Sequence, residues 1–106
     1  MKQKIRPGEV WIADLGIVAK IRPVLVLTSE PADCELALVT FVQHTTAVHG
    51  DNPWELRIAK PWLKEGAFHL QQVNTASTAR FERLLGALTE NEFNMVKTRL
   101  RERLGL

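Results

Sequence analysis

Histidine and threonine side chains gather in the segment FVQHTTAVHG, residues 41–50, which starts as an apolar run and ends as a polar loop. A threonine hydroxyl donates and accepts hydrogen bonds, and an imidazole binds metals or exchanges protons near neutral pH. The three histidines, His44, His49 and His69, show no helical i, i+4 pairing and no nearby carboxylate in a ligand spacing. We therefore expect no metal at this segment, and its hydroxyl and imidazole groups remain candidates for direct contact with a ligand.

Cysteine usage and the absence of common motifs narrow the chemistry further. Cys34 is the only cysteine, so no internal disulfide or cysteine-based metal cluster is expected, and its thiol is predicted to be a small buried filler. The sequence contains no phosphate-binding loop, dinucleotide-binding glycine motif, zinc-protease motif or nucleophile elbow. We expect no cofactor, and a nucleotide-dependent activity is disfavoured.

Length and composition predict one globular domain, residues 1–106. A chain of 106 residues with 45% hydrophobic and 25% charged residues can bury one core but not two. No apolar stretch approaches the roughly 20 residues that a membrane-spanning helix needs, and the basic start of the chain leads into no signal-type apolar block. We expect a cytoplasmic protein that does not contact a membrane.

Positive charge is concentrated toward the two ends of the chain, although the formal net charge is only +2. Residues 1–22 and 80–106 hold more Lys and Arg than Asp and Glu, whereas the middle is net acidic. If the two basic ends meet on one face, that face would suit a phosphate-bearing or acidic partner. The alternative is that these side chains are ordinary surface charges.

Hydrophobic alternation and β-branched residues predict five strands. Two of them begin at recognisable signals: Pro7 and Gly8 precede the first, and Arg22 before Pro23 must be extended because proline disfavours the helical region for the preceding residue. In the last strand, His69 and Gln71 share one face because side chains alternate along a strand. The predicted strands cover residues 9–15, 22–30, 36–42, 54–58 and 66–75.

The end of the chain predicts a single helix. Thr89 and Glu92 have the spacing of a capping box, and Gly105 suits the helix end. An apolar stripe of Phe93, Val96, Leu100 and Leu104 indicates a face packed on the core. With no helices between the early strands, parallel pairing is disfavoured, so we predict a mainly β fold in which a small antiparallel sheet curls toward a barrel and the C-terminal helix packs across it.

Several of these segments, taken together and in order, resemble the MazF/PemK toxins of type II toxin-antitoxin pairs. The shared features are the Gly-acid-aliphatic opening strand, the Arg-Pro-aliphatic second strand, the strand that ends in Thr-Thr, and the Leu-Gly-x-Leu that leads into the last helix. The resemblance extends over nearly the whole chain. Its segments are PGEVWIADLG, IRPVLVLTSE, FVQHTT, GAFHLQQVNT and RLLGALTENEFNMVKTRLRERLGL.

This resemblance implies a small SH3-like antiparallel β-barrel of the CcdB/PemK type that forms a homodimer. It also implies an endoribonuclease that cleaves single-stranded RNA (mRNA) without a metal and limits growth. The implied partner is a cognate antitoxin whose disordered tail lies along the active groove. Any binding to DNA would be indirect, through that antitoxin.

The catalytic residues implied by the resemblance are Arg22 and Thr45. Arg22 is expected to hold phosphate oxygens as a permanent bidentate cation, and Thr45 to donate its hydroxyl to the same phosphate. Some family members carry an arginine and an aspartate, proposed as acid and base, at positions that here hold His69 and Gln71. His69 is the best remaining group for proton transfer, since imidazole titrates near neutral pH. Gln71 cannot act as a base but can hydrogen-bond a nucleobase or a 2'-hydroxyl.

A wider set of polar residues is predicted to contact RNA around these three. A second departure from the family is the short apolar loop GIVAKIRP before the Arg-Pro step, and together the two departures leave the proton-transfer roles and base preference open. By alternation, His44 should face away from the groove if Thr45 faces into it, and His49 is interpreted as a loop residue. The predicted RNA-binding residues are Glu9, Lys20, His44, Thr46, Gln71 and Asn74.

Two alternative functions fit the same barrel. One is a toxin that binds a protein target, as the CcdB relatives of this barrel poison DNA gyrase. The other is a catalytically inactive RNA-binding or regulatory barrel, which Gln71 in place of a charged residue makes more plausible. The Arg-Pro and Thr-Thr segments favour the nuclease over both.

Overall fold

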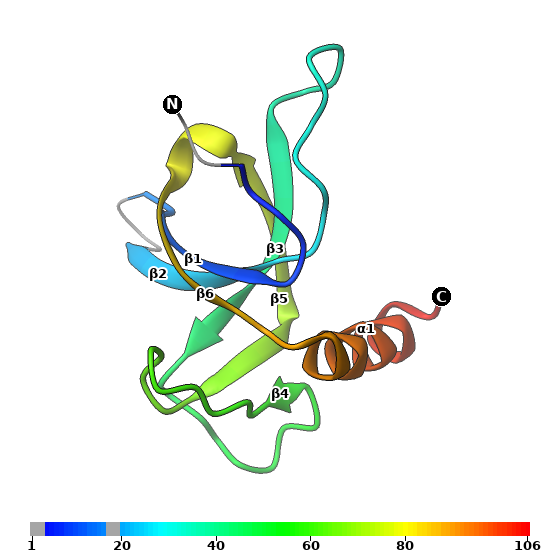
Figure 1. Ribbon diagram of the computed structural model, residues 1–106. Coiled ribbons are helices and arrows are strands. Elements are labelled where there is room, and N and C mark those ends of the chain that lie inside the picture. Colours follow the sequence, from blue (N-terminus) through cyan, green and yellow to red (C-terminus); the bar gives the residue numbers. More distant parts are fainter. Residues whose placement is uncertain (1–3, 17–19) are drawn as a thin grey trace.

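Six strands form one antiparallel sheet in the order β4-β5-β3-β2-β1-β6, and one helix packs against it (Figure 1). The computed structural model describes residues 4–16 and 20–106. A short 3₁₀ helix, η1, joins the two last strands. The elements are β1 Glu9–Asp14, β2 Ile21–Val26, β3 Leu38–Thr45, β4 Glu55–Leu56, β5 Ala67–Ser77, η1 Thr78–Arg80, β6 Phe81–Ala87 and α1 Glu90–Leu104.

All strand pairs are antiparallel, as predicted, but the number and lengths of the strands differ from the prediction. β6 was not predicted, because its segment FERLLGA lacks regular alternation and reads as the approach to the helix. β2 ends at Val26 rather than continuing to residue 30, and β4 keeps only two residues. β4 and β6 are the two ends of the strand order in the described residues, so the sheet is curled but not closed, and the predicted barrel is not confirmed.

The sheet buries apolar side chains on both faces, which explains the continuous apolar runs of its central strands. One cluster lies between the sheet and α1 and includes Leu25, Phe68 and Val96. The other lies on the opposite face and includes Val24, Phe41 and Phe81. Neighbouring residues of β2 belong to the two different clusters, so packing on both faces holds this strand in place. The position of its first residues at the edge of the core, including the predicted Arg22, is therefore fixed.

The C-terminal helix begins and ends as predicted. The Thr89 side chain accepts a hydrogen bond from the backbone of Glu92, the Glu92 side chain accepts one from the backbone of Thr89, and Gly105 adopts the left-handed conformation. Val96 and Leu100 are buried, but Leu104 is 53% exposed. The last turn therefore extends past the sheet, and the prediction that Leu104 packs on the core is wrong.

The long segment between β2 and β3 projects away from the sheet (Figure 1). Cys34 lies in this segment and is exposed, so the prediction of a buried thiol is wrong. The physical reason is the early end of β2, which leaves residues 32–38 in solvent. In the part of the chain that the structure describes, no helix is long and apolar enough to cross a membrane.

Candidate active site on one face of the sheet

The strand register brings the three predicted catalytic residues to one face of the sheet. Opposite residues in antiparallel strands have their side chains on the same face, as do residues two apart along one strand. Val24, two residues after Arg22 on β2, pairs with Gln43 of β3. Gln43 in turn pairs with His69 of β5, and Thr45 lies two residues beyond Gln43. We call this set, Arg22, Gln43, Thr45 and His69, the polar face.

The pairing of β2 and β3 ends just before Arg22 and Thr45. The last paired residues of β2 and β3 in this direction are Val24 and Gln43. Extending the register by two residues on each strand sets Arg22 opposite Thr45. On this register a guanidinium and a hydroxyl at these positions project from the same face of the sheet.

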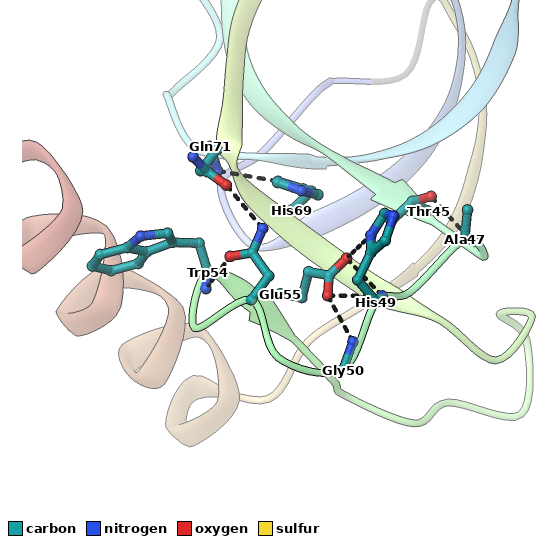
Figure 2. Close-up of polar contacts among 9 residues, drawn as sticks. Thr45, Ala47, His49, Gly50, Trp54, Glu55, His69 and Gln71 are labelled. Carbon is teal, nitrogen blue, oxygen red and sulfur yellow. Dashed lines mark hydrogen bonds and ion pairs between the residues drawn. The ribbon is translucent and has the colours of Figure 1, made fainter.

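Local hydrogen bonds orient the Thr45 hydroxyl. Its Oγ1 accepts a hydrogen bond of 3.1 Å from the backbone N–H of Ala47, at the start of the loop that follows β3 (Figure 2). A hydroxyl that accepts in this way still has its own hydrogen to donate. Thr45 can therefore donate to an anionic oxygen in front of the sheet.

His69 is held by its neighbour on β5. The backbone N–H of Gln71 donates a long hydrogen bond of 3.4 Å to His69 Nδ1 (Figure 2). Since an N–H can only donate, Nδ1 is the acceptor, and the neutral ring carries its proton on Nε2. In this state His69 offers a hydrogen-bond donor at Nε2 rather than a base.

The side chain of Gln71 fastens the loop between β3 and β4. Its Oε1 accepts a hydrogen bond of 2.9 Å from Asn52 Nδ2, and Asn52 Oδ1 accepts one of 2.9 Å from the backbone N–H of Trp54. The carbonyl oxygen of Gln71 is thus engaged within the protein. The carboxamide nitrogen is the part of Gln71 that can contact a ligand.

Glu55 fastens the same loop from β4. Its carboxylate accepts hydrogen bonds from the backbone N–H groups of His49, at 3.0 Å, and Gly50, at 3.3 Å, and lies 3.3 Å from His49 Nδ1. Burial raises the pKa of Glu55, but the hydrogen bonds from His49 and Gly50 outweigh it, so the pKa lies below its ordinary value. Glu55 is consequently ionised at neutral pH.

A pocket of about 360 Å³ is lined by three predicted site residues, Arg22, His44 and Thr46. His44 is 3% exposed and packs edge-on against Phe68, with ring centroids 5.1 Å apart. Burial lowers the pKa of His44, so its ring is neutral. His44 thus lies on the opposite face from Thr45, as alternation predicted. Lys64 also lines this pocket.

Lys20 and Asn74, two further predicted residues, line two other hollows. Asn74 and Gln43 line one of about 460 Å³, and Lys20 lines a more open one beside Asp14. Arg80 lines both hollows. The two basic ends of the chain therefore meet here, through Lys20 and Arg80.

Glu9 is the predicted site residue that the structure does not bring to this region. Ala13 of β1 pairs with Arg22, and Glu9 lies four residues earlier, about 13 Å along the strand. Its Oε1 accepts hydrogen bonds from the backbone of Arg6, at 2.7 Å, and from Trp11 Nε1, at 3.0 Å. Glu9 thus stabilises the start of β1. The predicted short loop before Arg22 includes residues 17–19, which lie outside the described residues.

Sequence reasoning missed Gln43, Lys64 and Arg80. Gln43 was hidden because its strand was predicted to end at residue 42, whereas β3 continues to Thr45. Arg80 and Lys64 lie outside the segments that carried the resemblance most strongly. The signal that could have found Arg80 is the excess of basic residues at both ends of the chain.

A small antiparallel β protein with a C-terminal helix and a basic, hydroxyl-bearing face is the class that this fold and site define. A family model of the PemK-like, MazF-like toxin of type II toxin-antitoxin systems matches residues 6–104. The chain therefore belongs to this toxin family. A comparison with curated proteins found no match.

Solved structures of similar fold cover nearly the whole chain. A MazE-MazF complex from Deinococcus radiodurans has a TM-score of 0.82 at 18% sequence identity, covering 99% of this chain and 99% of that chain. An endoribonuclease in complex with its cognate antitoxin from a mycobacterial species has a TM-score of 0.78 at 23% identity, covering 99% and 97%. The Mycobacterium tuberculosis toxin MazF-mt6 has a TM-score of 0.76 at 26% identity, covering 92% and 97%.

Proposed function

We propose that this toxin is a metal-independent endoribonuclease that cleaves single-stranded RNA. The observation that carries the proposal is the strand register that brings Arg22, Thr45 and His69 to one face. The similar proteins support it, since two of them are described as an endoribonuclease and as the toxin MazF-mt6.

RNA contains its own nucleophile, so few protein groups are needed. The ribose 2'-oxygen attacks the adjacent phosphorus, the P–O5' bond breaks, and the products are a 2',3'-cyclic phosphate and a 5'-hydroxyl. The protein must align the 2'-hydroxyl with the leaving oxygen, stabilise the extra negative charge and move two protons.

Arg22, Thr45 and His69 each have a defined part in this reaction. Arg22 binds the non-bridging phosphate oxygens, and its charge does not depend on pH. Thr45 donates its hydroxyl to the same phosphate. His69 donates from Nε2 to the phosphate or to the leaving 5'-oxygen, in keeping with the proton position that its contact with Gln71 imposes.

The hollows beside the polar face offer a path for the rest of the RNA strand. Lys20, Arg80 and Lys64 supply positive charge for flanking phosphates. Asn74 and Thr46 supply donors and acceptors for bases or ribose hydroxyls, and Gln71 keeps its carboxamide nitrogen for the same purpose. These side chains form the RNA-binding part of the proposal.

We extend the proposal to the partners of the toxin. The similar proteins crystallised with an antitoxin support a cognate antitoxin for this chain, through which any DNA contact would run. Membership of the family supports a homodimer. It also supports describing the curled sheet as an SH3-like barrel. We further propose that the protein acts in the cytoplasm, where mRNA is found.

The decisive experiment is incubation of the purified protein with a mixed-sequence RNA in excess chelator. We expect cleavage that leaves 5'-hydroxyl ends. Loss of a transition-state donor typically costs about 10²–10³ in rate, so Arg22→Ala and Thr45→Val should each reduce cleavage on this scale. Arg101→Ala is the matched control, because Arg101 lies exposed near the end of α1.

Two other outcomes would replace the proposal. Intact RNA together with inhibition of DNA gyrase would identify a toxin that binds a protein. RNA that is retained but not cut would identify an inactive RNA-binding protein. Cleavage that persists in Arg22→Ala would show that the polar face is not the active site.

A further inference from the structure

We propose that His49, oriented by Glu55, is the general base that activates the 2'-hydroxyl. This inference rests on the proposed ribonuclease function and assigns a step that the polar face leaves open. His49 lies in the loop between β3 and β4, a position that its sequence context alone marks only as loop.

The structure joins His49 to the polar face through Glu55. Glu55 of β4 pairs with His69 of β5, so the two side chains share one face of the sheet. The Glu55 carboxylate contacts His49 Nδ1 at 3.3 Å. In Figure 2, dashed lines join the Glu55 carboxylate to His49, and the His49 ring lies toward the end of β3 that carries Thr45.

The charge of Glu55 fixes the proton position on His49. An ionised carboxylate only accepts hydrogen bonds, so His49 Nδ1 must donate to it. The lone pair of the neutral ring is then on Nε2, the far side of the ring from Glu55. A carboxylate on one ring nitrogen and a free lone pair on the other is the arrangement that orients a histidine base and stabilises the imidazolium it forms.

His69 has the opposite proton arrangement. Its Nδ1 accepts from the backbone of Gln71, so its Nε2 carries the proton and cannot take another. The two histidines therefore offer complementary groups at one site. His49 presents an acceptor and His69 presents a donor.

The exposed fractions of the two side chains support different roles for Glu55 and His49. The Glu55 side chain is 2% exposed, whereas the His49 side chain is 74% exposed. The carboxylate is thus fixed inside the protein by the His49 and Gly50 backbone, while the ring that it orients is open to a ligand.

The proposed step balances as follows. His49 Nε2 takes the proton of the 2'-hydroxyl as the 2'-oxygen forms its bond to phosphorus. The P–O5' bond breaks, the 5'-oxygen takes a proton from solvent, and His69 Nε2–H stabilises the charge on that oxygen before it is protonated. The His49 imidazolium, stabilised by Glu55, then returns its proton to solvent.

Chemical rescue by imidazole distinguishes a general base from a structural residue, because added imidazole would not replace a purely structural side chain. In His49→Ala, we expect cleavage to fall by about 10²-fold or more, the usual contribution of a general base. Free imidazole should restore part of this activity, since His49 is 74% exposed and its removal leaves an open site. Arg22→Ala, which lacks the phosphate ligand instead, should not respond to imidazole.

The pH dependence of cleavage provides a second readout. A general base produces a limb in the pH profile of cleavage, and His49→Gln should lose this limb. The titratable groups to consider around His49 are Glu55 in contact with it, His69 on the strand paired with β4, and Asp51 in the same loop. Asp51→Asn and His69→Gln should each keep the limb that depends on His49.

Glu55 is a positioning residue in this proposal. Glu55→Gln should lower kcat and change KM less, because it removes the charge that stabilises the imidazolium. Glu65→Gln, at an exposed site, is the matched control. Wild-type protein that does not cut RNA would overturn both the function and this inference. Wild-type protein that cuts RNA, together with His49→Ala that cuts it equally well, would overturn the inference alone.

Discussion

At the scale of single residues, Gln43 connects the parts of the site. It pairs with His69 of the neighbouring strand β5 on one side. On the other side it pairs with Val24 of β2, which lies two residues from Arg22. It also lines the hollow that contains Asn74. In the proposed reaction, its position at the centre of the polar face suits an amide that contacts a base or ribose beside the phosphate held by Arg22.

His44 shows how a residue of the polar loop segment can be structural. Its ring is buried against Phe68, and Gly66 lies so close that the carbon of a methyl group there would be 2.8 Å from His44 Cε1. This packing positions the last residues of β3. The residue also lines the pocket with Arg22 and Thr46, although its ring is buried.

The buried ring of His44 predicts a dependence of stability on pH. Burial lowers the pKa of His44 in the folded protein, so the unfolded chain takes up this proton first as the pH falls below the ordinary histidine pKa of about 6.5. The free energy of unfolding should therefore be smaller at about pH 5.5 than at about pH 7.5. Urea unfolding at both values measures it, and the difference should shrink in His44→Gln. An unchanged difference would contradict a buried neutral ring.

At the scale of elements, the end of β3 is the part on which the site depends. This strand continues to Thr45 and pairs there with Ala67 of β5. The loop that follows it is fastened by Glu55 from β4 and by Gln71, through Asn52, from β5. The short β4 is thus more important for orienting the loop than for the sheet itself.

Gly66, immediately before β5, tests this dependence. A methyl group at this position would collide with the backbone carbonyl of Thr45 and with the His44 ring. Gly66→Ala should therefore cost about 1–3 kcal/mol of stability and displace Thr45, so that RNA cleavage falls by more than the loss of folded protein explains. Thermal unfolding and a cleavage assay at a temperature where the variant is folded measure the two effects.

Gly105→Ala provides the comparison for this substitution. Gly105 has a φ of 71° and nothing within 4 Å of an added methyl group, so its replacement strains the end of α1 without touching the site. We expect a loss of stability with normal cleavage per folded molecule. Equal cleavage per folded molecule by Gly66→Ala and Gly105→Ala would argue against a role for the end of β3 in the site.

At the scale of the whole molecule, the basic side chains of distant segments form one surface beside the polar face. Lys20 and Arg80 lie at one hollow, and Arg22 and Lys64 at another, with Ile21 lining both. The net charge of +2 understates this local concentration. Long-range attraction for a polyanion therefore comes from the arrangement of charges rather than from their sum.

This surface predicts how RNA binding responds to salt. Each phosphate neutralised on a single strand contributes a slope of about −0.7 to the plot of log K against log salt, so four contacts give about −2.8. Titration of an uncleavable RNA, with a 2'-deoxy group at the cut site, measures the slope. Lys64→Ala and Arg80→Ala should each reduce it by one contact, whereas Arg101→Ala should leave it unchanged. A salt-independent affinity would contradict this surface.

Much of the fold could be predicted from local patterns. Alternation, β-branched residues and the Thr89–Glu92 capping box identified the helix and the approximate positions of five strands, because these features depend on near neighbours in the chain. β6 could not be predicted, because its pairing with β1 includes register shifts that interrupt the regular alternation. The exposed Cys34 likewise depends on where β2 ends, which packing on both faces decides.

The sequence by itself determined which chemical groups the protein has and which of them follow the pattern of a toxin family: Arg22 before a proline and Thr45 at a strand end. Only the tertiary structure decided which groups meet. Register places His69 and Gln43 beside them, moves Glu9 to the far end of β1, and joins His49 to Glu55. The physical reason is that a strand's own residues set its alternation, whereas the partner strand sets its register, and a shift of one residue would turn every side chain to the other face.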